Sequence, residues 1–372
     1  MTFCIITHVP HGIQDKTYFA YAPYVREMNI WTKFADKIIV VAPLNIPIQT
    51  PIQVEYSHKT IDFRRVISFD FLTLWSAFKT IWMLPKILIK IYNAMKEADH
   101  IHLRCPGNMG LLGCIVQIVF PNKPKTAKYA GNWDLHSVQA RSYKFQKWIL
   151  RNTFLTRKCK VLVYGEWKDS SKNIKPFFTA SYYEKDKLEV FPRALKDKIS
   201  FAFIGTLSKG KQPLYAIQLV QELHKNGNSV QLFIYGEGTE RKRLENYIAE
   251  NKLNDFIFIK GNQNQETIKK AYLESHFVVL PSMSEGWPKV IAEGMFWGCL
   301  PITTTVSCLR TMLDNGNRGI LLNLNIDKDV EQVELLIKNQ EIYNNKVMQG
   351  MNWSRNYTLD VFENEVKALL DS

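Results

Sequence analysis

The sequence has no C-x-x-C pair and no basic segment ahead of an N-terminal apolar run. Its six cysteines are scattered along the chain, at Cys4, Cys105, Cys114, Cys159, Cys299 and Cys308. This spacing indicates neither a zinc site nor a disulfide framework, and it fits a reducing cytoplasm. The apolar residues Phe3 to Thr7 lead directly into a loop with a glycine turn, which favours a first strand over a signal peptide.

An uninterrupted apolar run long enough to cross a bilayer is also missing. The most apolar stretch, residues 71–95, is interrupted by Lys79, Lys86 and Lys90, and Pro85 should kink it. A full membrane crossing is therefore disfavoured. Two interpretations stay open, since an amphipathic helix with Trp75, Trp82 and its lysines could lie on a membrane surface or pack on a domain core.

Acidic residues are scarce in the first half of the chain. Residues 1–199 hold 30 Lys+Arg and 15 Asp+Glu, a balance of 30 − 15 = +15, and residues 200–372 hold 18 and 20, a balance of −2. The two halves sum to the net charge of +13. This asymmetry predicts that one domain meets an extended anionic partner, a membrane or a nucleic acid, unless it is only a solvated basic face. The basic residues 141–160 lie in the same half and favour the membrane surface.

Low-complexity tracts are absent, and 46% of the residues are hydrophobic, as in a globular protein. A length of 372 residues suggests two domains. Strand and helix patterns alternate from the start of the chain. The predicted fold class is therefore α/β with parallel sheets.

Residues 276–303, HFVVLPSMSEGWPKVIAEGMFWGCLPIT, combine a buried strand, a polar turn and a helix. A helix should begin near Trp287, because Pro288 suits a first helical position. The backbone N–H groups of Gly286 to Lys289 would then form an anion site at the positive end of the helix dipole. Glu285 in the turn and Glu293 inside the helix would border the same pocket, where carboxylates accept hydrogen bonds from sugar or ribose hydroxyls. The pattern indicates a nucleotide-sugar site; the alternative is a surface glutamate beside an ordinary helix start.

The spacing of Glu285 and Glu293, with GWP after the first and AEG around the second, resembles the E-x7-E signature of the retaining family 4 glycosyltransferases (glycosyl transferases group 1). The resemblance implies the GT-B fold, with two Rossmann-like domains facing each other across a cleft. It places Glu285 beside the donor sugar, Gly286, Trp287, Pro288 and Lys289 at the sugar and diphosphate, and Glu293 at the ribose. We expect an N-terminal, acceptor-binding domain over 1–195, a nucleotide-sugar domain over 196–350, and a C-terminal helix within 351–372 that packs back on the first domain.

A second donor motif follows the strand that opens the second half. Relatives have G-R-L-x-x-x-K-G there, with Arg and Lys gripping the diphosphate. Here Gly205 and Lys211 match, Thr206 stands in place of the Arg, and Lys209 is the candidate to compensate. The helix after this motif should start at Pro213. Three further strand-end glycines, expected to line the donor cleft or to serve as plain turn residues, are Gly236, Gly238 and Gly261.

Strand-end loops in the first half hold the remaining candidates, because ligands of α/β sheets bind at the carboxyl ends of strands. We expect the acceptor to meet His11, Arg104 and Asn108, and Gly12 to approach the donor diphosphate. Asp134 and His136 are the catalytic candidates, since relatives carry a His or Asp near this point. The rival explanations are a structural histidine, turn residues, and a helix N-cap at Asp134.

The reaction implied is transfer of a sugar, with retention, from a nucleoside-diphosphate sugar to a hydroxyl of a saccharide or lipid-linked acceptor in surface polysaccharide biosynthesis. Lys211 and the helix amides would stabilise the leaving diphosphate. Neither a D-x-D segment nor a histidine cluster suggests a metal site, so we expect no metal and no cofactor. The expected location is the cytoplasm, peripheral to the inner face of a membrane, without a nucleic-acid partner. The alternatives are a glycosidase, a nucleic-acid-binding protein, a GT-B epimerase and a non-catalytic sugar-nucleotide sensor.

Overall fold

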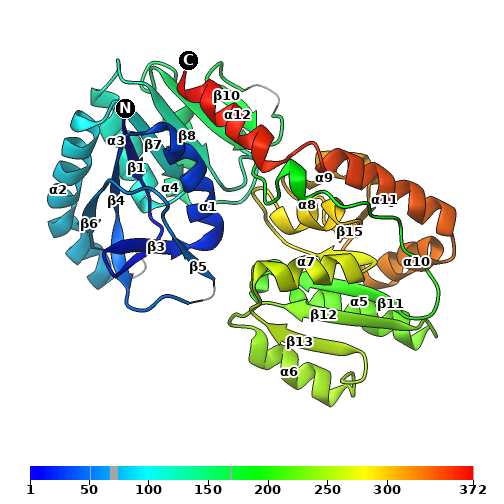
Figure 1. Cartoon of the computed structure of the whole chain (residues 1–372). Coiled ribbons are helices and arrows are strands. Elements are labelled where there is room, and N and C mark those ends of the chain that lie inside the picture. The colour runs from blue at the N-terminus through cyan, green and yellow to red at the C-terminus, as the bar shows by residue number, and fades with distance from the viewer. Residues whose placement is uncertain (51, 68–73, 168–169, 372) are drawn as a thin grey trace. The chain divides into compact units, whose positions relative to one another are not determined.

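A computed structural model describes residues 1–50, 52–67, 74–167 and 170–371 (Figure 1). The chain divides into two compact units. Unit 1 holds Met1–Phe178 and the C-terminal residues from Phe362, and unit 2 holds Thr179–Val361. The sequence prediction put the boundary at 195/196 and the return at 350/351, whereas the chain changes unit at 178/179 and 361/362.

Unit 1 is built on one sheet with the strand order β10-β9-β8-β7-β1-β4-β2-β3-β5, and β6 also pairs with β4. All pairs are parallel except β2–β3 and β3–β5. The strands are β1 (Thr2–Ile6), β2 (His11–Gln14), β3 (Thr17–Tyr21), β4 (Lys37–Ile46), β5 (Gln53–Glu55), β6 (Ile61–Val66), β7 (His100–Cys105), β8 (Lys125–Tyr129), β9 (Cys159–Tyr164) and β10 (Ile174–Phe177).

Helices cover both faces of this sheet. Successive strand residues point to opposite sides, so apolar side chains lie on both faces and need helices to bury them. The helices are α1 (Ala22–Trp31), α2 (Leu74–Glu97), α3 (Asn108–Val116), α4 (Arg141–Arg151) and α12 (Leu359–Leu370). Cys4 and Ile6 of β1 belong to the hydrophobic cluster formed with α2, α3 and α4. Phe3 points the other way and stacks on Trp31 of α1, at 6.0 Å between ring centroids.

The C-terminal part of α2 packs on the core of unit 1, where Ile87, Ile91 and Met95 are buried. This supports the core-facing interpretation for that part of the stretch 71–95, although Trp82 is exposed. Residues 71–73 and the side chains of Trp75 and Lys79 lie outside what the structure describes. No helix in the described ranges is both long enough and apolar enough to cross a membrane.

Unit 2 has a six-stranded, all-parallel sheet with the order β13-β12-β11-β14-β15-β16. Its strands are β11 (Ile199–Ile204), β12 (Val230–Tyr235), β13 (Ile257–Gly261), β14 (Phe277–Leu280), β15 (Leu300–Thr303) and β16 (Ile320–Leu321). Its α-helices are α5 (Pro213–Lys225), α6 (Arg241–Glu250), α7 (Gln265–Glu274), α8 (Lys289–Phe296), α9 (Leu309–Met312), α10 (Ile326–Ile337) and α11 (Gln340–Ser354).

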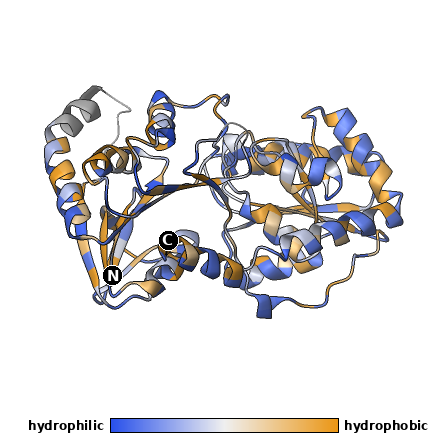
Figure 2. Ribbon diagram, turned by 90° about the horizontal axis from the view of Figure 1, so that it is seen from above, coloured by the Kyte–Doolittle hydropathy of each residue, from blue (hydrophilic) through white to orange (hydrophobic). Residues whose placement is uncertain are grey.

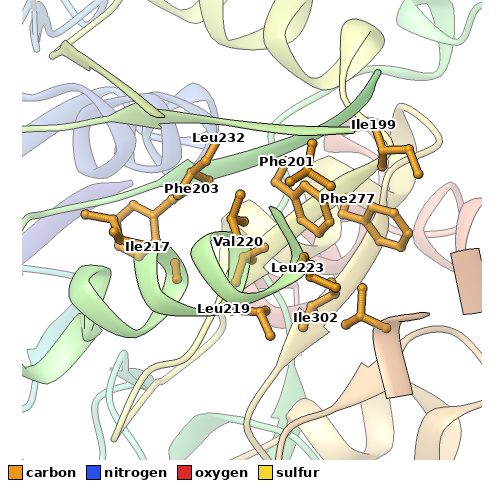
Figure 3. Packing of buried hydrophobic residues seen from close by; sticks show 14 of the residues in the cluster. Ile199, Phe201, Phe203, Ile217, Leu219, Val220, Leu223, Leu232, Phe277 and Ile302 are labelled. Carbon is orange, nitrogen blue, oxygen red and sulfur yellow. The ribbon is translucent and has the colours of Figure 1, made fainter. Parts of the chain in front are cut away.

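The core of unit 2 lies between this sheet and its helices. Figure 3 shows Val220 and Leu223 of α5 beside Phe201 of β11 and Phe277 of β14, and all four are fully buried. Figure 2 shows the strands of both units as mainly hydrophobic ribbons, while the helices alternate hydrophobic and hydrophilic residues. Amphipathic helices on parallel sheets are the predicted α/β class, which is thereby confirmed.

Candidate active site

The turn between β14 and α8 carries Glu285, whose side chain is only 8% exposed and whose Oε1 accepts a hydrogen bond from Lys211 Nζ at 2.5 Å. Lys211 ends a short 3-10 helix, η4 (Lys209–Lys211), 74 residues earlier. The two loops are also joined by the backbone, since Met283 N donates to Gly210 O at 2.8 Å. Unit 2 therefore brings together two residues that the sequence predicted from separate motifs.

The start of α8 differs from the prediction. The helix begins at Lys289, and Pro288 is its N-cap with φ −76° and ψ 85° rather than its first residue. Pro288 has no N–H, and Lys289 N donates to Trp287 O at 2.9 Å. The expectation of four open amides at Gly286 to Lys289 is therefore wrong for these two positions. The anion site predicted at this helix start would have to rely on the N–H groups of the turn before it and on the helix dipole.

Glu293 lies one turn from the end of α8, where both carboxylate oxygens already accept hydrogen bonds. Ser181 Oγ donates to Oε1, and Tyr272 OH donates to Oε2 at 3.1 Å. Burial, reinforced by the charge of Glu293, raises the pKa of Tyr272 well above its ordinary value, so this hydroxyl keeps its proton and donates. Ser181 and Tyr272 were not predictable from the sequence, because Ser181 precedes Glu293 by 112 residues and neither stands in a recognisable motif.

The space beside Glu293 is small. A cavity of about 10 Å³, lined by Ser181, Tyr182, Lys289 and Glu293 among others, holds about one water molecule. Each carboxylate oxygen retains a second lone pair in addition to the one that Ser181 or Tyr272 uses. A ribose hydroxyl would therefore bind Glu293 at those lone pairs or replace Ser181.

Three of the candidate glycines of unit 2 are required by the close packing of its strand-end loops. A Cβ on Gly236 would lie 1.9 Å from Gly205 O, and one on Gly238 would lie 2.3 Å from Leu207 O. Gly261 has φ +68°, and its Cβ would lie 2.9 Å from Glu237 Oε1. Close packing in the turns is therefore enough to explain these three glycines without a ligand. Gly205 differs, because its φ of +153° favours glycine and nothing lies within 4 Å of its Cβ position.

Thr206 and Lys209, the other two candidates of this motif, are both exposed. Within the described ranges Lys209 has no carboxylate partner, whereas Arg241 is paired with Glu237 and Glu245. Lys209 is therefore an available cation close to Lys211 along the chain. Its assignment as the substitute for the missing arginine stays a prediction.

The two catalytic candidates of unit 1 lie in the loop between β8 and α4. Asp134 Oδ1 accepts a hydrogen bond from His136 N at 2.9 Å, and Asp134 N donates to Asn132 Oδ1 at 2.9 Å. The N-cap of α4 is Ala140, so the rival explanation of Asp134 as a helix cap is wrong. The carboxylate instead closes a local turn, which leaves the catalytic role of both residues as a prediction.

His11 and Gly12 do not lie in a loop as predicted, but in strand β2 of a hairpin. His11 is fully buried, with Nδ1 2.8 Å from Val9 O and Nε2 2.9 Å from Tyr56 OH. Burial lowers the pKa of His11 to about 4. A Cβ on Gly12 would lie 2.1 Å from the ring of Phe19, so close packing requires this glycine. Both residues thus have structural roles that do not need a ligand.

Arg104, predicted in the loop after β7, is the fifth residue of that strand. It is buried and pairs with Glu27 at 2.5 Å, and Glu27 also accepts from Lys128 at 3.0 Å. Asn108 is the first residue of α3. No group of three or more His, Cys, Asp or Glu residues that could hold a metal occurs in the described part of the chain. Metal independence stays a prediction.

Comparisons with known proteins extend this description. The model of the family "Glycosyl transferases group 1" matches residues 184–353, which include Lys211, Glu285 and Glu293. An uncharacterized glycosyltransferase of Methanocaldococcus jannaschii is 29% identical over 42% of this chain and 43% of its own length. An uncharacterized glycosyltransferase of Haemophilus influenzae is 28% identical over 45% of this chain and 47% of its own length. The matched part thus spans less than half of these curated relatives.

Solved structures resemble the fold over the whole chain. The Anabaena protein HepE in complex with UDP and glucose has a TM-score of 0.70 and 12% identity, covering 100% of this chain and 99% of its own. Sucrose-phosphate synthase of Thermosynechococcus elongatus has a TM-score of 0.67 and 16% identity, covering 100% and 98%. These comparisons do not favour a nucleic-acid-binding protein. Residues 184–353 thus match the glycosyl transferases group 1, and the chain has the α/β fold class of the GT-B glycosyltransferases.

Proposed function

We propose that the protein is a retaining, family 4 glycosyltransferase, which moves a sugar from a nucleoside-diphosphate sugar to a hydroxyl of a saccharide or lipid-linked acceptor. The observation that carries this proposal is the contact of Lys211 with Glu285 directly before α8. A cation and a carboxylate held together at a helix start provide groups for both parts of a nucleotide-sugar, the diphosphate and the sugar hydroxyls.

When the donor binds, contacts with the donor would replace the ion pair between Lys211 and Glu285. The ammonium of Lys211 has three donors, so it can turn toward a diphosphate while it stays near Glu285. One carboxylate oxygen of Glu285 is then released to accept a hydroxyl of the donor sugar. The pair keeps both side chains in place before the substrate arrives, which reduces the entropy lost on binding.

The chemical step builds negative charge on the leaving diphosphate while the sugar becomes oxocarbenium-like. Lys211 and the turn amides before α8 would stabilise that charge, and Lys209 would add to it. These groups supply electrostatic stabilisation that a metal provides in other transferases, hence our proposal of a metal-independent reaction. The departing phosphate oxygen takes the proton of the acceptor hydroxyl, and Asp134 and His136 help to orient the acceptor.

Uridine is the nucleoside that we propose for the donor. The HepE structure is a complex with UDP and glucose. The relative from Limosilactobacillus reuteri, 30% identical over 28% of this chain and 20% of its own length, is a UDP-N-acetylglucosamine–peptide N-acetylglucosaminyltransferase subunit. Glu293 would hold the ribose, and the loop after Gly261 would meet the base. The acceptor would belong to surface polysaccharide synthesis on the inner face of a membrane, which the basic unit 1 would approach.

The test is a screen of nucleotide-sugars by thermal stabilisation, followed by product analysis. A donor that binds the folded protein raises its Tm, and about 2.7 kcal/mol of stabilisation is expected at 100 times the Kd. Turnover should fall at least a hundredfold in Glu285→Gln and in Glu293→Ala. Unchanged turnover in both variants would refute the site assignment, and an inverted product would refute the retaining class.

A further inference from the structure

Unit 1 contains a cavity of about 450 Å³ between α4, the β8–α4 loop and the segment before β10. Its lining includes three cations of α4, which are Lys144, Lys147 and Arg151, together with Trp148 of the same helix. Ser137 and Ser171 add hydroxyl groups. None of the described lining residues is acidic. The volume is in the range of small-molecule sites.

The cations of α4 share one face of the helix, because the spacing of three and four residues follows the helical turn. No carboxylate among the described residues lies within 4.0 Å of the Lys144 or Lys147 ammonium. Like charges at this spacing destabilise a helix unless a counter-charge is present. Both ammonium groups line the cavity without an ion pair at that distance, so they can take an anion from outside the chain.

Of the three cations, Lys147 is the strongest indication of an anion site, because its side chain is buried. Its Nζ donates to the backbone oxygen of Asp134 at 2.9 Å and lies 5.5 Å from the ring centroid of Tyr129 and 5.7 Å from that of Trp133. Burial lowers the pKa of Lys147 to about 8. The charge of the Asp134 carboxylate also acts on this ammonium and partly offsets the effect of burial. An ammonium with one hydrogen bond to a carbonyl retains further N–H donors for an anion.

One wall of the cavity is aromatic. Trp148 is 56% exposed, and its ring stacks on Phe145 with the centroids 5.7 Å apart and the planes 12° apart. Ser137 Oγ donates to Asp134 O at 2.6 Å, and Ser171 Oγ donates to Asn173 Oδ1 at 2.8 Å. Ser137 Oγ also accepts from Gln139 Nε2 at 2.7 Å, which leaves it one lone pair for a polyol hydroxyl. Ser171 Oγ can accept from a polyol as well. The cavity thus combines sites for an anion, for hydroxyl groups and for the apolar face of a ring.

We propose that this cavity binds the phosphate of a phosphorylated saccharide, with Lys144, Lys147 and Arg151 around the phosphate and the sugar ring against Trp148. The inference rests on the proposed function in one respect, namely that the saccharide is the acceptor. The lining loop also carries Asp134 and His136, the catalytic candidates. The phosphate ester could belong to a soluble sugar phosphate or to the link between a sugar and a carrier lipid.

The experiment is calorimetric titration of the full chain with N-acetylglucosamine 1-phosphate, N-acetylglucosamine and inorganic phosphate. The sugar phosphate should bind at least tenfold more tightly than either part. Lys144→Gln/Arg151→Gln should weaken its binding at least tenfold, a factor that corresponds to about 1.4 kcal/mol. Lys59→Gln/Lys175→Gln removes the same charge from exposed positions of unit 1 outside the cavity and should change the Kd less than twofold.

A second experiment, protection of lysine amines from acetylation, tests whether the ligand lies in this cavity. The sugar phosphate should slow the acetylation of the Lys144 amine by an N-hydroxysuccinimide ester and leave that of Lys175 unchanged. Lys144→Glu alters an exposed residue, so it tests the same charge without threatening the fold. A farnesyl diphosphate-linked N-acetylglucosamine that binds at least tenfold more tightly than the soluble compound would identify the carrier-lipid source, and equal binding would identify the soluble one.

Equal affinity for the sugar phosphate in the wild type, Lys144→Glu and Lys144→Gln/Arg151→Gln would overturn the proposal. Competition between UDP and the sugar phosphate would also overturn it, as would the absence of binding at millimolar concentration. Failure of the proposed nucleotide-sugar function would give a different result from failure of this proposal. In that case no nucleotide-sugar would bind, while the sugar phosphate would still bind and still depend on Lys144.

Discussion

At the scale of single residues, the contact between Lys211 and Glu285 links the two sequence motifs on which the functional proposal depends. Both residues were candidates from short patterns, G-x5-K and E-x7-E, and their roles at a diphosphate and a sugar stay a prediction. Their mutual contact at 2.5 Å was not predictable, since it depends on β11 and β14 being neighbours in the sheet. The partners of Glu293 were missed for the same reason.

Replacement of Lys211 should mainly affect the chemical step. Loss of one charged group at a leaving diphosphate lowers kcat by about 10²–10³-fold, corresponding to roughly 2.7–4 kcal/mol of transition-state stabilisation. We expect this from Lys211→Gln, whereas Lys209→Gln should raise the donor KM with a smaller effect on kcat. Steady-state kinetics would measure both, with the exposed Lys242→Gln as the control. Equal kcat in Lys211→Gln and the control would contradict the role of Lys211.

The glycines of unit 2 give a stability prediction. A methyl group on Gly236 would lie 1.9 Å from Gly205 O, and φ of +148° is strained for any other residue. Gly236→Ala should lower the free energy of unfolding by about 2–5 kcal/mol, the sum of backbone strain and overpacking. Gly210→Ala is the control, because nothing lies within 4 Å of that Cβ position. Urea unfolding would compare the two, and equal losses would argue against the packing explanation.

At the scale of elements, the sequence predicted long periodic segments well and the N-terminal hairpin poorly. The strand Phe277–Leu280 and the helix from Pro213 match because a β-branched run and a proline at a helix start are strong local signals. The loop predicted after β1 is instead the hairpin β2–β3. Its turn residues Asp15 and Lys16 have φ +49° and +66° without a glycine, so the usual Asn-Gly or Asp-Gly signal is missing.

The burial of His11 in this hairpin predicts a pH dependence of stability. Its pKa falls from 6.5 to about 4 on folding, so the unfolded chain binds an additional proton between these values. Stability is therefore fully present above pH 6.5 and is lost as the pH falls toward 4. His11→Gln preserves hydrogen-bonding capacity and removes the titration. The loss of unfolding free energy between pH 6 and 5 should be smaller in the variant by about 1.2 kcal/mol.

Urea midpoints at the two pH values would measure this difference, and the contribution of carboxylates cancels because it is common to both proteins. His100, whose pKa burial also lowers to about 4, contributes in both proteins and cancels likewise. Parallel pH profiles for wild type and His11→Gln would mean that His11 is accessible to protons in the folded state.

At the scale of the whole molecule, the charge asymmetry distinguishes the two halves of the chain, +15 and −2 by the sums given above. In unit 1 the basic helix α4 also presents Phe145 and Trp148, and Phe154 follows it with 70% of its side chain exposed. Exposed aromatic rings among cations are typical of proteins that lie on anionic membranes. Composition alone predicted the basic half, but the exposure of these rings required the structure.

The membrane proposal predicts binding to vesicles that contain phosphatidylglycerol, with an affinity that falls as the salt concentration rises. Phe154→Ser should weaken vesicle binding about three- to tenfold, through the loss of buried apolar area. Phe191→Ser is the matched control, since Phe191 in unit 2 is equally exposed at 70%. Co-sedimentation would measure both, and an equal effect of the two changes would remove the assignment of the membrane face to unit 1.

The central claim is that Lys211, paired with Glu285 in the turn before α8, holds the diphosphate of a nucleotide-sugar. The most direct measurement is calorimetric titration with UDP of the wild type and of Lys211→Met, which removes the charge and leaves a side chain of similar length. The account predicts saturable binding by the wild type and a Kd at least tenfold higher in the variant. A Kd for UDP that is the same in both proteins would contradict it.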